Sequence, residues 1–316
     1  MAEAEVENEE YTKLKNSKFK QQKLPGWRPV PTITTTSIIF ISFGVVFIVL
    51  GIVILVLSGQ IEEISFRYDE YCKTKGTITD GINKCKIKLD IKNDMNKKVM
   101  IYYQLDGFYQ NHRRYVKSKS DDQLNGKVIS LEDMKDSEDC DPVVTNKEMG
   151  KTISVKGNAL NGSELAVPCG LIAKSYFNDN FTDWTLNGNP LIVNEKDIAW
   201  KADKELKYKN SDLTKQWIDM TDEHFIVWMR PAGLPNFRKL WGRIEQDLHS
   251  GDSVEVVIED KFEVKSFNGK KYLILSTVNA FGGKNTFLGI SYIVLGSISI
   301  ILAIIFFIGY KVRKTD

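Results

Sequence analysis

The sequence has few histidines and carries none of the common catalytic motifs. Its three histidines, His112, His224 and His249, lie far apart in the chain. There is no Gly-x-Ser-x-Gly elbow and no His-Glu-x-x-His motif, and the cysteines are not spaced as zinc ligands. The net charge is only +2, without a basic patch interleaved with aromatic residues. We therefore expect no enzyme activity, no cofactor, no metal and no nucleic-acid partner.

Charge is also missing from two long stretches of the chain. Residues 37–57 and residues 286–310 contain no Asp, Glu, Lys or Arg. A helix needs about 20 apolar residues to cross the bilayer core, and both stretches are long enough. The alternative is a helix buried in a soluble core, which seldom runs so far without charge. A signal peptide does not fit the first stretch, because a polar tail of residues 1–36 precedes it.

Small residues recur every seven positions in both predicted membrane helices. They are Ser37, Gly44, Gly51 and Ser58 in the first, and Gly289, Gly296 and Ala303 in the second. Seven residues make nearly two helical turns, so each set lines one face where another helix can approach closely. These faces could join the two helices, dock them on a larger membrane protein, or reflect only the frequency of Gly and Ser in such helices. With no charge in either span, we do not expect this chain to transport anything alone.

The flanking charges predict the orientation. Lys and Arg are frequent in both terminal tails, whereas the segment after the first span (SGQIEEISF) has two acidic residues and no basic residue. Because basic flanks stay in the cytosol, both termini are expected there. The predicted organisation is a cytosolic tail (1–36), transmembrane helix 1 (37–57), an exoplasmic domain (58–286), transmembrane helix 2 (287–309) and a cytosolic tail (310–316).

Cysteines and glycosylation sequons are confined to the predicted exoplasmic domain. An even number of cysteines on one side indicates disulfides formed in an oxidising compartment. Four cysteines allow three pairings, and we favour neighbour pairing: Cys72 with Cys85, and Cys140 with Cys169. The two sequons begin at Asn161 and Asn180. Both features place this domain on the lumenal or extracellular side.

The exoplasmic domain is mostly β in character. Residues 64–68, 99–105 and 225–229 predict strands. Residues 254–267 and 271–278, joined by Asn268-Gly269, predict a β-hairpin. Residues 236–248 predict a helix, because apolar residues recur there at spacings of three and four. The centre, about residues 117–220, is expected to be loop-rich. The expected fold is a membrane protein with two transmembrane α-helices and a large β-rich exoplasmic domain, resembling an antiparallel β-sandwich with disulfide-stapled insertions.

Several long motifs follow one another along nearly the whole chain. They are FKQQKLPGW (19–27), FYQNHRRYV (108–116) with QLNG (123–126), PCGLIA (168–173) with FND (177–179), FIVWMRPAGLPNFRKL (225–240) and GGKN (282–285). By these motifs the sequence resembles the cell division control protein 50 family, also called the transmembrane protein 30 or ligand-effect modulator family. Two departures stand out: the spacing from Cys140 to Cys169 is longer than is usual in that family, and the sequon has moved from Asn178 to Asn180.

The resemblance implies a non-catalytic accessory (beta) subunit of a phospholipid flippase. Family members pair with a type IV P-type ATPase that moves phospholipid from the exoplasmic to the cytosolic leaflet. They assist its folding, its exit from the endoplasmic reticulum and its activity, in membranes from the Golgi to endosomes or the plasma membrane. The resemblance also implies a β-sandwich-like ectodomain that covers exoplasmic loops of the ATPase. The alternative function is a stand-alone cell-surface receptor or adhesion protein.

Three regions are predicted to bind the partner. For the N-terminal tail, the alternative is a lipid-surface anchor, because Lys18, Lys20 and Lys23 favour anionic headgroups. For FYQNHRRYV, the arginines offer forked donors, and the alternative is an internal ion pair with core aromatics. The third region is the small-residue face of the second membrane helix. The predicted residues are Phe19, Lys20, Gln21, Gln22, Leu24, Pro25, Trp27, Phe108, Tyr109, Arg113, Arg114, Gly289 and Gly296.

Overall fold

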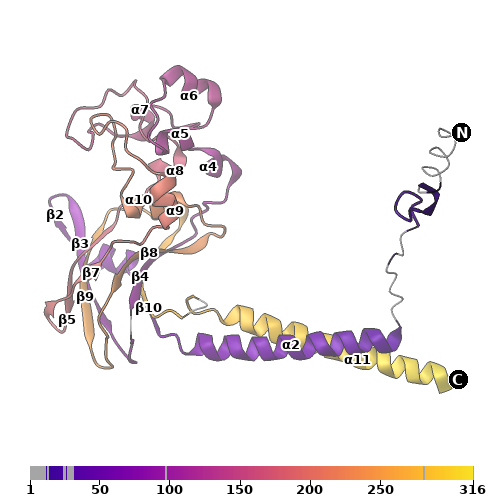
Figure 1. Ribbon diagram of the computed structural model, residues 1–316. Helices are drawn as coiled ribbons and strands as arrows, with labels where there is room; N and C mark the ends of the chain where they lie inside the picture. Colours follow the sequence, from indigo (N-terminus) through magenta and orange to yellow (C-terminus); the bar gives the residue numbers. More distant parts are fainter. Residues whose placement is uncertain are drawn as a thin grey trace, which may run out of the picture. The chain divides into compact units, whose positions relative to one another are not determined.

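The computed structural model describes residues 12, 14–23, 26, 32–96, 98–279 and 282–315 (Figure 1). The chain divides into two compact units. The first comprises Met1–Leu55 and Thr286–Asp316, and it contains most of the two long helices. The second, Val56–Asn285, contains every strand found in the described residues.

Helix α2 spans Ile33–Gly59 and helix α11 spans Thr286–Thr315. Both are long and apolar enough to cross a membrane. Away from their mutual contact their apolar side chains are exposed: Val49 is 53% and Ile301 is 55% exposed. A continuous apolar surface of this kind suits lipid rather than water. Two candidate transmembrane helices therefore flank the domain, as predicted.

The small-residue faces of α2 and α11 meet each other. The two helices run side by side and antiparallel (Figure 1), with Phe40 against Phe306 and Phe47 against Tyr292. A Cβ on Gly44 would lie 2.6 Å from Cγ1 of Ile300. A Cβ on Gly296 would lie 2.7 Å from the carbonyl oxygen of Gly44. Any larger side chain would push the helices apart, so the stripes join the two helices, which is the first of the alternatives raised by the sequence.

Two five-stranded antiparallel sheets form the body of the second unit. The first sheet has the order β1-β10-β4-β8-β7, with β1 Glu63–Arg67, β10 Lys270–Ser276, β4 Val99–Asp106, β8 Asn236–Ile244 and β7 Val193–Asn194. The second sheet has the order β2-β3-β9-β5-β6, with β2 Thr77–Thr79, β3 Ile82–Asp90, β9 Ser253–Asp260, β5 Asn180–Leu186 and β6 Asn189–Pro190. Strands β1 and β4 lie where the sequence predicts them.

The two sheets face each other across one hydrophobic core. Alternate residues of β4 and β9 are buried, as strands with one face on the core require. Phe181 of β5 meets Trp241 of β8 edge to face, with ring centroids 4.9 Å apart. Tyr103 of β4 stacks on Phe177, with ring centroids 3.9 Å apart. The prediction of a β-rich domain built from antiparallel sheets is confirmed.

The helix predicted for residues 236–248 is wrong, because these residues begin with strand β8. The register with β4 shifts where Ile101 pairs with Gly242 and Tyr102 pairs with Leu240, which leaves Trp241 as an extra, bulged residue. A bulge changes which positions face the core. Phe237, Trp241 and Ile244 are therefore all buried at spacings of four and three, the same spacings that a helix would give.

The predicted hairpin around Asn268-Gly269 is also wrong. Strand β9 pairs with β3 and β5 of the second sheet, whereas β10 pairs with β1 and β4 of the first. Asn268 does adopt the positive φ of a turn, 53°, but it follows a short 3-10 helix at Lys265–Phe267. The turn therefore carries the chain from one sheet to the other.

The apolar run at residues 225–229, predicted as a strand, lies in helix α10, Glu223–Met229. The Asp222 side chain accepts a hydrogen bond from the backbone N–H of His224 and so caps this helix. Phe225, Ile226, Trp228 and Met229 are buried. Period alone cannot separate a helix from a strand in a run of this length.

Short helices and loops make up the rest of the second unit. We call residues 107–179 and 195–235 the loop-rich segment, and its helices gather beyond one end of the sheets (Figure 1). They are α4 Arg113–Lys117, α5 Asp121–Leu124, α6 Leu131–Ser137, α7 Asn146–Met149, α8 Leu171–Lys174, α9 Lys201–Leu206 and α10. Helix α3, Asp69–Lys75, lies outside this segment, next to the sheets.

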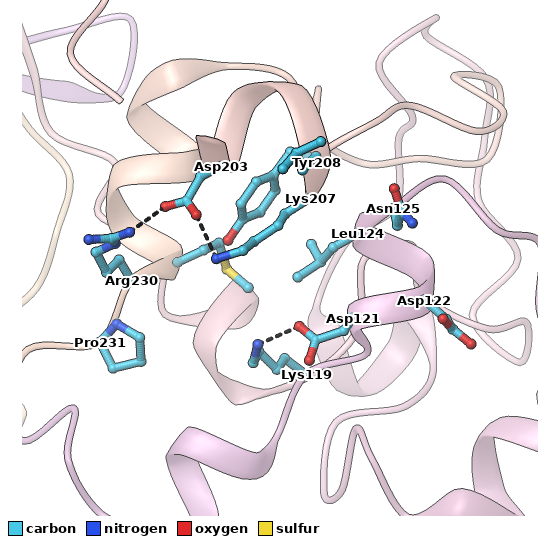
Figure 2. A pocket seen from close by; sticks show the side chains of 12 residues that line it. Lys119, Asp121, Asp122, Leu124, Asn125, Asp203, Lys207, Tyr208, Arg230 and Pro231 are labelled. Carbon is cyan, nitrogen blue, oxygen red and sulfur yellow. Dashed lines mark hydrogen bonds and ion pairs between the residues drawn. The ribbon is translucent and has the colours of Figure 1, made fainter. Parts of the chain in front are cut away.

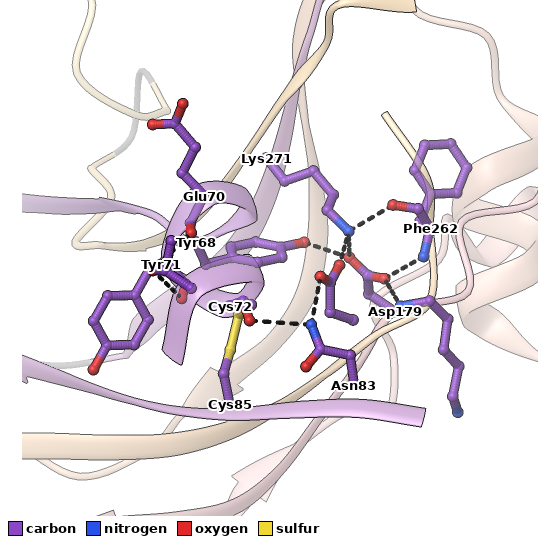
Figure 3. The surroundings of a disulfide bond; sticks show 12 residues. Tyr68, Glu70, Tyr71, Cys72, Asn83, Cys85, Asp179, Phe262 and Lys271 are labelled. Carbon is purple, nitrogen blue, oxygen red and sulfur yellow. Dashed lines mark hydrogen bonds and ion pairs between the residues drawn. A yellow bond between two sulfur atoms is a disulfide. The ribbon is translucent and has the colours of Figure 1, made fainter. Parts of the chain in front are cut away.

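Disulfides join Cys72 to Cys85 and Cys140 to Cys169, the neighbour pairing favoured from the sequence. The first ties α3 to β3 (Figure 3). The second closes a loop within the loop-rich segment. All four cysteines are buried.

Candidate partner interface

The motifs FYQNHRRYV and RPAGLPNF come together through backbone contacts. The N–H groups of Gly107 and Phe108 both donate to the carbonyl oxygen of Pro235, at 3.0 and 3.2 Å. The Asn111 side chain donates to the carbonyl oxygen of Gly233 at 2.9 Å. The fully buried Gln110 side chain accepts from the N–H of Ala232 at 2.9 Å. These bonds fix one loop against the other although they lie more than a hundred residues apart in the chain.

The aromatic side chains of these motifs lie beneath the surface. Phe108 sits in a cluster of rings whose centroids lie 5.4–6.4 Å from its own. The neighbouring rings are those of Tyr115, Trp228, Phe237, Phe262 and Phe267. Edge-to-face aromatic contacts of this kind add to the burial of apolar area. The half-buried Phe108 thus supports the surface rather than forming it.

The motifs PCGLIA and FND pack against the same cluster. The Tyr115 hydroxyl lies 2.7 Å from the Ser175 hydroxyl, and the Trp228 indole donates to the carbonyl oxygen of Ile172 at 2.8 Å. The Ser118 hydroxyl accepts from the N–H of Leu171 at 2.8 Å. Burial raises the pKa of Tyr115 to about 12, against smaller lowering by its hydrogen bonds with Ser175 and Gln110. The motifs FYQNHRRYV, PCGLIA, FND and FIVWMRPAGLPNFRKL therefore meet in one place.

Asp179, the last residue of FND, holds together the ends of several elements (Figure 3). Its carboxylate accepts from the Tyr68 hydroxyl at 2.8 Å, from Nζ of Lys271 at 2.7 Å and from the N–H groups of Lys261 and Phe262, both at 2.6 Å. Lys271 also pairs with Asp260. Burial raises the pKa of Asp179, and the Lys271 ammonium opposes that rise. This buried network joins β10 of the first sheet to the end of β9 in the second.

A second buried lysine, Lys239, caps the C-terminal end of helix α10. Nζ of Lys239 donates to the carbonyl oxygens of Val227, Trp228 and Arg230, at 2.9, 3.0 and 2.6 Å. Carbonyl groups at a helix C-terminus otherwise lack partners, and a cation there also meets the negative end of the helix dipole. Burial, together with the positive charge of Arg230, lowers the pKa of Lys239 to about 7. Lys239 therefore positions the loop that starts at Arg230.

The loops that the ring cluster and Lys239 hold in place form an exposed surface. Tyr109 is 64% exposed and Leu234 is 70% exposed, which is unusual for large apolar side chains that are held by ordered loops. Arg113 and Arg114 are exposed, and neither makes a hydrogen bond or an ion pair with the described residues. We define the motif surface as Tyr109, Asn111, Arg113, Arg114, Gly233 and Leu234. It combines apolar area with unpaired positive charge.

A hollow of about 470 Å³ lies next to the loop that starts at Arg230 (Figure 2). Asp203 accepts from Arg230 at 2.8 Å and pairs with Lys207 at 2.7 Å. Burial raises the pKa of Asp203, but hydrogen bonds from Lys207 and Arg230 outweigh it and lower the pKa. The Arg230 guanidinium also stacks on the ring of Trp200, 4.4 Å from its centroid, although Trp200 is 67% exposed. The charges here are paired, unlike those of the motif surface.

Comparison with known proteins gives the same family as these motifs. The model of the LEM3 (ligand-effect modulator 3) family / CDC50 family matches residues 54–316. The chain belongs to the CDC50 family. ALA-interacting subunit 3 of Arabidopsis thaliana is 40% identical over 329 residues, which cover 95% of this chain and 86% of that protein. Cell cycle control protein 50A of Bos taurus is 36% identical over 342 residues, covering 95% and 90%. Cell cycle control protein 50B of Homo sapiens is 30% identical over 347 residues, covering 95% and 94%.

The other predicted site residues of this CDC50-family chain are not part of the motif surface. Phe19 is 76% exposed, and Lys20, Gln21 and Gln22 are exposed beside it. Leu24, Pro25 and Trp27 lie outside the described residues. Gly289 and Gly296 face α2.

The two predicted glycosylation sites differ in exposure. Asn161 is exposed, whereas Asn180 is partly buried at the start of β5. Within the described ranges, no three His, Cys, Asp or Glu side chains are grouped so that they could hold a metal ion.

Sequence reasoning missed the buried polar residues that support the motif surface of this CDC50-family chain. In the sequence, Lys239 and Lys271 look like surface residues of a strand, and Gln110 looks like part of a polar loop. The one available signal was position: Gln110, Asp179 and Lys239 all lie within the motifs that carry the resemblance. Their roles follow only from the fold that brings these motifs together.

Proposed function

We propose that this protein is the non-catalytic accessory (beta) subunit of a phospholipid flippase. Its partner would be a type IV P-type ATPase that moves phospholipid from the exoplasmic to the cytosolic leaflet, and the protein would assist the folding, exit from the endoplasmic reticulum and activity of that ATPase. The observation that carries the proposal is the convergence of four family motifs at one exposed surface with unpaired arginines. A relative named as an ALA-interacting subunit is, by that name, part of a larger assembly.

The proposal includes an orientation for the chain. Residues 1–36 and 310–316 would lie in the cytosol, residues 37–57 and 287–309 would cross the membrane, and residues 58–286 would lie in the lumen or outside the cell. Two disulfides in the second unit support this orientation, because such bonds persist in oxidising compartments. The protein would travel with the ATPase from the endoplasmic reticulum to the Golgi, endosomes or plasma membrane.

We propose that the motif surface binds an exoplasmic loop of the ATPase. Arg113 and Arg114 would pair with carboxylates of that loop, and Tyr109 and Leu234 would bury apolar area against it. The internal ion pair considered as an alternative for the two arginines has no partner among the described residues. Phe108 would act through the ring cluster that supports the surface.

In the membrane, Gly289 and Gly296 would act by allowing α2 and α11 to pair closely, so that both helices meet the ATPase as one body. Replacing Gly296 with Leu should weaken the pairing, because even a Cβ there would lie 2.7 Å from the carbonyl oxygen of Gly44. Recovery of the ATPase with this variant should fall below that of the wild type. Equal recovery would remove these glycines from the proposal.

The cytosolic tail would contact the ATPase through residues 19–27, in which Phe19 is exposed. Deletion of residues 1–27 should then change ATPase activity more than it changes membrane insertion. The opposite result would favour the lipid-surface anchor that the tail lysines also suit.

The direct test is affinity purification of the tagged protein in mild detergent, with mass spectrometry of the proteins that accompany it. We expect a P-type ATPase in about equal molar amount, and retention of this chain in the endoplasmic reticulum when that ATPase is depleted. Recovery of the protein alone from the cell surface would favour a stand-alone receptor or adhesion protein instead.

A further inference from the structure

An apolar groove lies in the loop-rich segment, apart from the motif surface. Its volume is about 390 Å³, within the range of roughly 300–1,000 Å³ that is usual for ligand sites. Ile129, Leu131, Leu165 and Val167 form its floor, and their inner sides pack on the hydrophobic core. Val128 stands at the groove with 87% of its surface exposed. Lys127, Glu164, Asp212 and Lys215 provide a polar rim.

The sequon that begins at Asn161 borders this groove. Leu160 and Ser163, on either side of Asn161, both line it. Oδ1 of Asn161 accepts from the N–H and the hydroxyl of Ser163, at 3.1 and 2.9 Å. This turn leaves Nδ2, the atom that a glycan modifies, without a hydrogen-bond partner among the described residues. Asn161 is itself exposed, so its side chain is accessible at the edge of the groove.

The loop that carries Asn161 is fixed to the rest of the segment. The carbonyl oxygen of Asn161 accepts from the side chain of Asn146 at 2.9 Å and from the N–H of Glu164 at 3.1 Å. The N–H of Asn146 donates to Glu164, and that of Lys147 donates to Gly162, both at 3.0 Å. A group attached to Asn161 would therefore start from a defined position beside the groove.

We propose that Asn161 carries an N-linked glycan whose first sugars pack into this groove and cover Val128. N-acetylglucosamine has an apolar ring face and a rim of polar groups, which match the apolar floor and the charged rim. Asn180 offers no such setting: it is partly buried in β5, paired opposite Glu259. The proposal rests on the exoplasmic orientation proposed above.

The attachment uses a lipid-pyrophosphate-linked oligosaccharide as the donor, supplied by the transferase of the lumen. The Asn161 amide nitrogen forms a bond to the anomeric carbon of the sugar, and the bond from that carbon to the pyrophosphate oxygen breaks. The lipid pyrophosphate leaves, and the transferase takes up the amide proton. The packing of the sugars follows when the domain folds.

The test begins with mass spectrometry of glycopeptides from the full-length protein purified from a eukaryotic cell. We expect Asn161 to be occupied. Asn161→Gln should lower the melting temperature by roughly 2–4 °C, the shift expected for about 1 kcal/mol in a domain of this size. Asn180→Gln serves as the matched control and should leave the groove unaffected.

A substitution in the groove distinguishes packing of the glycan in the groove from its attachment alone. Val128→Ser keeps the sequon and removes an exposed side chain that nothing in the folded core requires. Val128→Ser should lower the melting temperature of the protein that is glycosylated at Asn161. Introduced into the Asn161→Gln variant, it should leave the melting temperature unchanged. Additive effects of the two substitutions, or an unoccupied Asn161 alongside an occupied Asn180, would overturn the proposal while leaving the orientation intact. If neither sequon were occupied and the cysteines were reduced, the exoplasmic orientation would be rejected together with this proposal, whether or not an ATPase is recovered.

Discussion

The two sheets and the loop-rich segment of the second unit are stabilised in different ways. The sheets bury aliphatic and aromatic side chains on alternating positions of paired strands. The loop-rich segment has helices of at most seven residues. It contains most of the buried polar side chains, among them Gln110, Gln123, Asn146 and Gln216, all at most 1% exposed.

Two of these buried amides, Gln123 and Gln216, hydrogen-bond to backbone groups that have no partner in a helix or sheet. Gln123 donates to the carbonyl oxygen of Ala166 at 3.1 Å and accepts from the N–H of Cys169 at 3.0 Å. Gln216 likewise accepts from the N–H of Ser211 at 2.6 Å and donates to the carbonyl oxygen of Ile218 at 3.2 Å. Backbone groups without a ladder must find such partners when they are buried. The comparison teaches that an irregular backbone can be ordered when buried side chains satisfy its polar groups.

The largest expected effect comes from breaking the network that joins the sheets. Asp179→Ala would leave the Tyr68 hydroxyl and two backbone N–H groups without their acceptor and weaken the pairing of Lys271. We expect a loss of about 3–5 kcal/mol, the usual result of removing one member of a buried ion pair. Thermal unfolding in detergent would measure it, with the exposed Asp90→Ala as the control. Equal melting curves would show that the sheets need no such link.

Loss of the disulfide between Cys140 and Cys169 should affect the loop-rich segment. In the chain-entropy model, closing the loop between Cys140 and Cys169 contributes roughly 3–4 kcal/mol. In the double variant Cys140→Ser/Cys169→Ser, hydrogen exchange should accelerate in the loop-rich segment and stay slow in β4 and β9. Uniform acceleration would mean that the two regions unfold as one.

A smaller effect is expected from a single buried amide. Gln123→Met fills a similar volume but leaves the N–H of Cys169 and the carbonyl oxygen of Ala166 unsatisfied, which should cost about 1–3 kcal/mol. Val256→Ala in β9 is the matched change for the sheets, where the loss comes from apolar area and a cavity. If Gln123→Met is neutral in thermal unfolding, buried polar groups do not maintain the loop-rich segment.

The last effect should appear as a dependence of stability on pH. The pKa of Lys239 is lowered to about 7 in the folded state, so between that pH and about 10.5 the folded protein binds fewer protons than the unfolded chain. Its contribution to stability should therefore rise with pH across this window, by at most about 1.4 kcal/mol per unit. The melting temperature of the wild type, relative to that of Lys239→Met, should increase from pH 7 to pH 9. A constant difference would place the pKa outside this window.

The sequence predicts the layers of this protein better than its connections. Uncharged stretches and strand alternation depend on local pattern, so α2, α11, β1 and β4 were predicted. The bulge at Trp241, the crossing at Asn268 and helix α10 depend on which distant strand each segment meets. The local pattern of the sequence does not show that pairing. The residues of the candidate interface divide in the same way: Arg113 and Tyr109 belong to a visible motif, whereas the supporting Lys239 and Asp179 look like ordinary polar residues.

The central claim is that the motif surface holds the ATPase, and the molar ratio of ATPase to this protein after mild-detergent purification tests it most directly. The double variant Arg113→Glu/Arg114→Glu should lower that ratio at least tenfold, while Lys147→Glu/Lys156→Glu, a matched pair of exposed bases elsewhere in the loop-rich segment, should leave it near one. Both variants should melt like the wild type, because none of these side chains is buried. A folded arginine variant that still recovers the ATPase in equal amount would contradict the account.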